Sequence, residues 1–187
     1  MKKSLFLRLA AVAAIAGFTA KVTAQDAPKM PEPVKEHKWL EQFAGEWESE
    51  MEVTIPGQPA SMKGKSTESA KMMGGFWLIQ NGQGEMMGMK MTNILTLGYD
   101  PEKKKYTGTW VDSMSSMLWK YEGTVDESGK KLTLDTEGPC PMKGGANTKF
   151  KEVLEIKDKD TKVFTSSYEE EPGKWVTMVT VTSKRKK

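Results

Sequence analysis

Most of the chain after residue 45 alternates between apolar and polar side chains over short stretches. Trp119, Tyr121 and Gly123, for example, are each two residues apart and so would lie on one face of a strand (they share a parity), and the residues between them are polar. Alternation with a period of two is typical of a β-strand that buries one face. The stretches that show this pattern, or a run of strand-forming residues, predict strands at 46–55, 62–71, 76–82, 89–99, 106–112, 117–125, 131–136, 148–157, 162–169 and 174–184.

Short turn sequences separate these predicted strands. Pro56-Gly57, Asp100-Pro101 and Pro172-Gly173 combine residues that favour tight reversals. About ten short strands without a long helix between them predict antiparallel pairing of sequence neighbours. Such a sheet needs a shared apolar interior, which a closed barrel or a sandwich provides. We therefore predict an all-β fold, an antiparallel meander of about ten strands preceded by a short helical turn.

The N-terminal segment 1–24 has the three parts of a cleavable export signal. Lys2, Lys3 and Arg8 form a positive start, and the apolar run 9–18 follows. Val22-Thr23-Ala24 then offers small side chains before a cleavage site at Gln25. The apolar run is shorter than the roughly 20 residues that span a bilayer. We predict an exported protein, periplasmic or extracellular after cleavage, without a stable membrane span.

Removal of the predicted signal changes the charge of the chain. The full sequence carries 28 basic and 25 acidic side chains, a net charge of +3. Segment 1–24 holds four of the basic residues and none of the acidic ones, so the remaining chain has 24 basic and 25 acidic residues. A nearly neutral chain does not favour a nucleic-acid surface. We therefore expect no nucleic-acid partner.

The rest of the sequence divides into three predicted parts. Segment 25–36 contains three prolines and few large apolar residues, which indicates an extended linker. The barrel domain is expected over 37–184. The last residues, 185–187, are expected to form a solvated basic tail.

A Gly-x-Trp sequence, Gly45-Glu46-Trp47, marks the entry to the first predicted strand. The glycine lets the chain bend sharply, and the tryptophan can fill the barrel floor. This arrangement resembles the calycin superfamily, which includes lipocalins and fatty-acid-binding proteins. The resemblance implies that a basic side chain of the last strand, Lys184 or Arg185, stacks on Trp47.

A longer set of motifs resembles one bacterial family, the domain of unknown function 1579 family. Its motifs are matched by Leu97–Pro101, Tyr106–Met114, Tyr121–Val125, Leu132–Leu134 and Met73–Leu78, together with the segment from Trp39 to Trp47. The resemblance covers about residues 37–184. It implies a lipocalin-like β-barrel or a related β fold, and no particular activity.

Aromatic and methionine side chains are the candidates for contact with a small hydrophobic ligand. They fall on consecutive predicted strands, and an inward orientation would combine rings, thioethers and a few polar groups in one pocket. The same residues would pack as a filled core if the barrel were narrow. The candidates are Trp77, Met89, Met91, Tyr99, Tyr106, Trp110, Asp112, Trp119 and Tyr121.

The methionines also raise a metal hypothesis. Met86, Met87, Met89 and Met91 lie within six residues, and thioethers are soft ligands that select Cu(I). The alternative is that methionine fills irregular space in an apolar interior. Apart from this hypothesis we expect no cofactor.

Catalytic motifs are weak. The single histidine, His37, lies at the start of the domain, where neither a nucleophile motif nor a C-terminal haem ligand accompanies it. Asp112-Ser113 is more typical of a strand-end cap than of a catalytic pair. Cys140 is the only cysteine, so an intrachain disulfide is excluded, and the thiol is buried, free or bridged to a second chain. We therefore expect no enzymatic activity.

Three functions remain open at this point. The first is binding of a small hydrophobic or amphipathic molecule inside the barrel. The second is a structural or interaction role in the cell envelope with a filled core. The third is periplasmic Cu(I) binding through the clustered methionines.

Overall fold

The first strand shows how the sequence builds the sheet. In β1 (Gly45–Val53), Trp47, Ser49 and Val53 are buried. The glutamates between them, at positions 46, 48, 50 and 52, are exposed. Successive side chains of a strand point to opposite faces, so this alternation places one face of β1 against the interior and the other in solvent.

The computed structural model describes residues 30–58, 60–86 and 88–187. The predicted signal peptide, 1–24, and the first part of the predicted linker lie outside the described residues. All the elements below belong to one unit, Glu32–Lys187. No helix in the described ranges is long and apolar enough to cross a membrane.

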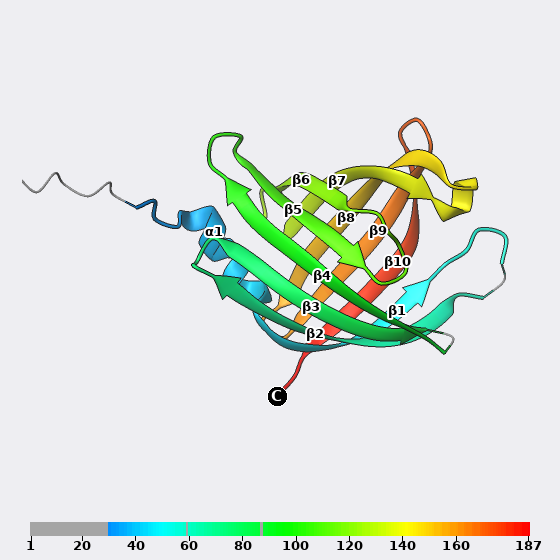
Figure 1. Cartoon of the computed structure of the whole chain (residues 1–187), viewed down its shortest axis with the longest axis horizontal. Coiled ribbons are helices and arrows are strands. Elements are labelled where there is room, and N and C mark those ends of the chain that lie inside the picture. The colour runs from blue at the N-terminus through cyan, green and yellow to red at the C-terminus, as the bar shows by residue number, and fades with distance from the viewer. Residues whose placement is uncertain (1–29, 59, 87) are drawn as a thin grey trace, which may run out of the picture. The chain divides into compact units, whose positions relative to one another are not determined.

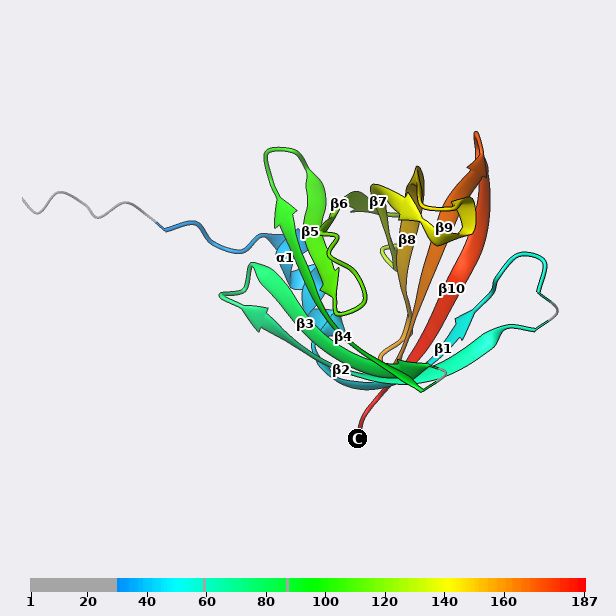
Figure 2. The same ribbon diagram turned by 45° about the vertical axis from the view of Figure 1, so that its right-hand side comes forward.

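Ten antiparallel strands form a closed barrel in which each strand pairs with its sequence neighbours and β1 pairs with β10 (Figure 1). The predicted fold class is therefore confirmed, and the closed barrel replaces the alternative of a sandwich. Figure 2 looks into the barrel, with β2–β5 on one side and β7–β10 on the other. After β1, the strands are β2 (Met62–Met73), β3 (Trp77–Met86), β4 (Met89–Asp100), β5 (Lys105–Asp112), β6 (Trp119–Val125), β7 (Lys131–Cys140), β8 (Ala146–Asp158), β9 (Thr161–Glu171) and β10 (Lys174–Arg185).

Two of these strands extend four residues past their predicted ends. β3 continues from Gly82 to Met86, and β7 continues from Thr136 to Cys140. The sequence of each extension favours a turn, because the first contains glycines and the second contains Gly138-Pro139. Both extensions nevertheless pair with a neighbour, because Gly84 faces Ser66 in β2 and Gly138 faces Thr148 in β8.

A short helical segment closes one end of the barrel. It consists of α1 (Lys35–Trp39) and the 3-10 helix η1 (Leu40–Phe43). A separate 3-10 turn, η2 (Pro141–Lys143), connects β7 and β8. The Trp39 Nε1–H donates to the Gly129 carbonyl at 2.7 Å, and the Tyr106 hydroxyl donates to the Glu36 carbonyl at 3.1 Å. The folded domain thus begins before His37, within the predicted linker, and β10 includes Arg185 of the predicted basic tail.

Next to this segment, the interior of the barrel is a packed apolar layer. Leu40 and Phe43 are buried among inward-facing leucines of four strands. Burial of a leucine or phenylalanine side chain stabilises a fold by about 1.5–3 kcal/mol. The leucines of this layer are Leu78, Leu95, Leu97, Leu132, Leu134 and Leu154. This filled layer forms the closed end of the barrel.

Candidate functional site in the barrel interior

The barrel floor is built around Trp47. Its Nε1–H donates to the Phe43 carbonyl at 2.9 Å, and the Arg185 guanidinium lies 4.2 Å from the ring centre. Gly45 has φ 123°, and a Cβ there would lie 2.4 Å from Nη1 of Arg185. Glycine is therefore required for both the backbone conformation and the space. Of the two basic residues that the calycin resemblance left open, Arg185 is the one that stacks on Trp47.

A buried ion pair lies beside this floor. Lys162 Nζ is 2.5 Å from Glu68 Oε2 and 4.6 Å from the Trp47 ring centre. Burial lowers the pKa of Lys162, and the negative charge and hydrogen bond of Glu68 oppose that shift. Ser49 donates to Ser183 at 2.8 Å in the same region. Lys162 is thus paired with Glu68, and Ser49 with Ser183.

Tyr99 and Tyr106, two predicted ligand residues, belong to the closed end. Their rings pack against each other at 5.1 Å, and Tyr99 also contacts His37 at 5.8 Å between ring centroids. Trp39 covers Tyr106 at 5.4 Å. Burial raises the pKa of Tyr106, and the charge of Glu36 adds to the shift. These tyrosines anchor the helical segment to the barrel.

Trp77, another predicted ligand residue, lies on the outer face. It is 38% exposed, whereas its neighbour Leu78 is buried inside. Its ring covers Gly98, where a Cβ would lie 2.7 Å from the indole. Trp77 is therefore separated from the interior by the sheet itself.

The methionine cluster is only partly described. Met89 is 51% exposed at the start of β4, and Met91 is half-buried on the inward parity. Met87 and the side chain of Met86 lie outside the described residues, so the Cu(I) hypothesis stays a prediction. In the described ranges, no group of three or more His, Cys, Asp or Glu side chains could hold a metal ion.

Trp110, Asp112, Trp119 and Tyr121 are brought together on the inward faces of β5 and β6. Trp110 and Trp119 are paired in the register, and the Trp110 Nε1–H donates to Asp112 Oδ2 at 3.0 Å. Asp112 Oδ1 accepts the Met114 backbone N–H at 2.8 Å. The aspartate thus fixes one indole and caps the strand end.

The arrangement of Asp112, Ser113 and His37 does not form a catalytic triad. The Ser113 hydroxyl accepts the Thr92 backbone N–H at 3.1 Å, as a strand-end cap does. His37 is buried at the closed end, where its Nδ1 accepts the Val34 N–H and its ring meets Phe76 at 5.2 Å.

Three inward polar residues were missed as candidates. Glu152 and Ser166 are paired in the register of β8 and β9, and Asn93 is paired with Asp112 in β4 and β5. A signal existed in the sequence, because Glu152 has the parity of Phe150 and Leu154. We call the set of Asn93, Asp112, Tyr121, Glu152 and Ser166 the interior polar cluster.

Glu152 is the most buried acid of this cluster, with 6% of its surface exposed. Ser166 Oγ donates to its Oε1 at 3.0 Å, while Oε2 has no hydrogen-bond partner among the described residues. Burial raises the pKa of Glu152 to about 8, and the Ser166 hydrogen bond only partly offsets the shift. Burial also raises the pKa of Tyr121, with added effects of the Glu152 and Asp112 charges, so the three groups are electrostatic neighbours.

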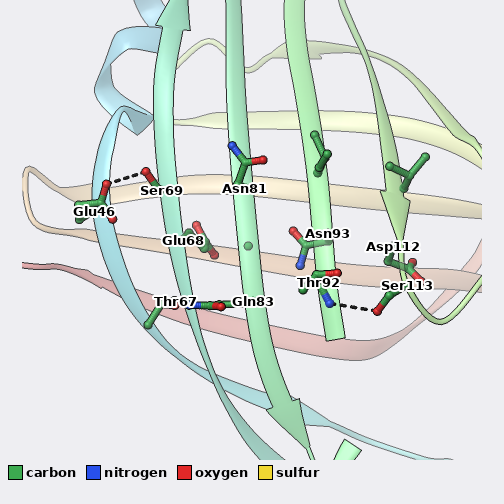
Figure 3. Close-up of a pocket in the computed structure, with 13 residues that line it drawn as sticks. Glu46, Thr67, Glu68, Ser69, Asn81, Gln83, Thr92, Asn93, Asp112 and Ser113 are labelled. Carbon is green, nitrogen blue, oxygen red and sulfur yellow. Dashed lines mark hydrogen bonds between the residues drawn. The ribbon is translucent and has the colours of Figure 1, made fainter. Parts of the chain in front are cut away.

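Asn93 presents a second unmatched acceptor. The residue is 9% exposed, and its Oδ1 is buried without a hydrogen-bond partner in the described part of the chain. Its amide lies over Gly82 of β3, where a Cβ would meet Oδ1 at 2.5 Å. Gly82 therefore makes room for the Asn93 amide beside Glu68, and Figure 3 shows Glu68 and Asn93 on the two sides of β3.

Several inward side chains above the floor are partly exposed. In a filled core, inward side chains are buried, but several here remain half-buried. They come from strands on both sides of the barrel: Met51, Trp110, Trp119, Phe164 and Val181. The barrel thus has a packed floor, and above it partly exposed inward side chains lie beside a second buried cluster of Cys140, Phe150 and Tyr168.

A groove of about 540 Å³ lies across β2–β5 (Figure 3). Most of its lining comes from two cross-strand rows of the outer face: Ser69, Asn81, Ile94 and Val111, then Thr67, Gln83, Thr92 and Ser113. The inward row of Glu68, Gly82, Asn93 and Asp112 contributes to the lining between them. The short polar residues of this face are exposed, so the groove is a surface feature.

Ten antiparallel strands, a Gly-x-Trp floor and a basic residue stacked on that tryptophan define a lipocalin-like barrel of the calycin type. The model of the family described as "Protein of unknown function (DUF1579)" matches residues 32–185. The chain belongs to this family, as its sequence motifs predict.

Two solved structures share the fold at low sequence identity. The S-type phycobiliprotein lyase CPES from Guillardia theta is 16% identical, with a TM-score of 0.55 over 82% of this chain and 94% of that chain. Rv2717c from M. tuberculosis is 11% identical, with a TM-score of 0.60 over 83% of this chain and 100% of that chain. None of the curated proteins compared with the chain matches it.

Proposed function

We propose that this protein is exported and binds a small hydrophobic or amphipathic molecule inside the barrel. The observation that carries the proposal is the pairing of two features on the inward faces of the strands above the floor. The half-buried indoles of Trp110 and Trp119 lie there, and so do the unmatched acceptors of Asn93 and Glu152.

Each feature supports one half of an amphipathic ligand. Indole faces left accessible to water gain from contact with an apolar body, because removing apolar surface from water is favourable. Buried acceptors without partners carry a desolvation penalty of about 1–3 kcal/mol each, which a ligand donor relieves. Ligand pockets combine a mostly apolar lining with a few placed polar groups in this way.

The export part of the proposal rests on the N-terminal segment. Two lysines and an arginine precede the apolar run, and Val22-Thr23-Ala24 supplies the cleavage pattern. The intact mass of the protein recovered from the host envelope or medium tests it. A mass that corresponds to a chain starting at Gln25 supports export with cleavage, and a mass that corresponds to a chain starting at Met1 contradicts it.

Ligand binding is tested with the neutral fluorescent probe N-phenyl-1-naphthylamine. We expect saturable binding and energy transfer from the interior tryptophans. Val181→Trp fills the interior from β10 and should weaken binding by about tenfold or more, since a probe cannot share its space. Thr182→Trp is the matched control, because Thr182 is the next residue and is exposed on the opposite face.

The outcome of this pair of variants decides the proposal. Equal loss or equal retention of binding in the two variants would place the probe outside the barrel. Far-UV circular dichroism verifies that both variants fold, and Met51→Phe gives a second, smaller obstruction from β1. Absence of saturable binding to the wild type would favour the envelope interaction role instead.

A further inference from the structure

We propose that the ligand of the barrel interior carries a cationic ammonium head, held by Glu152 together with Asn93 and Asp112. This inference rests on the proposed ligand-binding function and specifies its ligand class. It assigns the interior polar cluster as the anchor for the head and the half-buried indoles as the surface for the apolar body.

The first support is the kind of hydrogen bond that the cluster lacks. Oε1 of Glu152 is already taken by Ser166, and its Oε2 is unmatched within the described structure. Asn93 Oδ1 is an amide acceptor that is unmatched in the same way. An ammonium group has three N–H donors and no acceptor, so it complements these oxygens.

The second support is that these groups lie near one another on the inward faces of the strands. Asn93 and Asp112 are register partners on β4 and β5, and both have inward parity. Tyr121 on β6 lies within electrostatic reach of both Asp112 and Glu152. The cluster thus runs along the interior from β4 to β8, with Tyr121 between its two acids.

The third support is the balance of charge inside the barrel. Two basic side chains of the described strands face inward, and both are engaged at the floor. Lys162 pairs with Glu68, and Arg185 donates to the Ala44 carbonyl at 2.6 Å. Asp112 and Glu152 have no basic partner among the described residues, so the upper interior lacks a cation. A carboxylate or phosphate head would find no basic side chain to pair with at Asp112 and Glu152.

The indoles add a fourth contribution. Trp110 and Trp119 are adjacent across β5 and β6, and Trp110 is oriented by its bond to Asp112. An organic cation is attracted to an indole face, most strongly where water is excluded. A bound ammonium also supplies the positive charge that stabilises a buried Glu152 carboxylate.

The experiment compares three probes that share one apolar chain: dodecylammonium, dodecanol and dodecanoate, each below its micelle concentration. Binding is followed at pH 7 by isothermal titration calorimetry and tryptophan fluorescence. We expect dodecylammonium to bind about tenfold or more tightly than either of the others, because close charge pairs contribute more than 1.4 kcal/mol. Equal or weaker binding of dodecylammonium overturns the inference.

Glu152→Gln keeps the shape of the side chain and removes its charge. We expect it to weaken dodecylammonium binding far more than dodecanol binding, so that the preference for dodecylammonium disappears. Asn93→Leu, a second variant on another strand, should reduce the preference in the same direction. The matched control is Glu155→Gln, because Glu155 pairs with Lys157 at 2.8 Å on the outer side of β8.

The outcomes separate the two proposals. If none of the three probes binds, the ligand-binding function itself fails. If dodecanol binds and dodecylammonium has no advantage, only the cationic head is wrong. A preference that persists in Glu152→Gln would also contradict the assignment, because the anchor would then lie elsewhere.

Discussion

The guanidinium carbon of Arg185 lies 4.2 Å from the centre of the Trp47 ring, and the two residues are partners in the register that closes the barrel. The same guanidinium donates to the carbonyls of Ala44 at 2.6 Å and Gln42 at 3.0 Å. Its Nε also donates to the Lys159 carbonyl at 3.1 Å. One side chain thus joins the last strand, the helical segment and the turn before β9.

Replacement of Arg185 should therefore destabilise the whole barrel. Arg185→Ala removes three hydrogen bonds and a cation–π contact, and we expect the free energy of unfolding to fall by about 2–4 kcal/mol. Arg185→Lys should recover less than half, because an ammonium lacks the planar fork that reaches several carbonyls. Urea denaturation measures both. Lys186→Ala, an exposed neighbour, should change stability by less than about 0.5 kcal/mol, and an equally small effect of Arg185→Ala would contradict this role.

The buried pair of Lys162 and Glu68 makes a second prediction. Lys162→Met leaves the Glu68 carboxylate without its partner, and breaking a buried pair costs about 3–5 kcal/mol. The double variant with Glu68→Leu should regain most of that loss, because no isolated charge then remains. A double-mutant cycle from urea denaturation measures the coupling. Additive effects of the two single changes would show that the residues do not depend on each other.

The strands could be predicted because one physical property, burial of a single face, repeats along the sequence. Trp119, Tyr121 and Gly123 share a parity, and the structure places all three toward the interior. The choice between Lys184 and Arg185 could not be predicted, because it depends on the register between two strands about 140 residues apart. That register pairs Arg185 with Trp47 and turns Lys184 outward.

The candidate site was harder to predict for two reasons. Trp77 lies on the same run of predicted strands as the other aromatic candidates, but it is an even number of residues from the exposed Asn81 and therefore faces out. Glu152 carries no motif, and its only signal is an acid on the apolar parity of Phe150 and Leu154. Whether such an acid is paired or unmatched depends on neighbours from other strands, which alternation does not reveal.

Cys140 should be unreactive in the folded protein. Its side chain is fully buried with Phe150 and Tyr168 at the end of β7, and a buried thiol is neither nucleophilic nor reachable. We expect no reaction with Ellman's reagent under native conditions and one equivalent in guanidinium chloride. Thr182→Cys, at an exposed position of β10, is the control and should react at once. Native reactivity, or a disulfide-linked dimer on a non-reducing gel, would contradict burial.

Glu152 should make the stability of the protein depend on pH. Burial holds its pKa at about 8 in the folded state, against an ordinary value of 4.5. Between these values the folded state binds one more proton than the unfolded state, so stability falls as pH rises through this window. The slope is at most about 1.4 kcal/mol per pH unit, and it levels off above the folded pKa.

Glu152→Gln removes this titration without removing the side chain. We expect wild type and variant to be similarly stable near pH 5, and the variant to be more stable by roughly 3–5 kcal/mol at pH 9. Urea denaturation at unit steps from pH 5 to pH 9 measures the difference. Glu155→Gln, on the outer side of the same strand, should retain the wild-type slope. If Glu152→Gln also retains it, the carboxyl group is ionised in the folded protein at neutral pH, and a cation or water already compensates its charge.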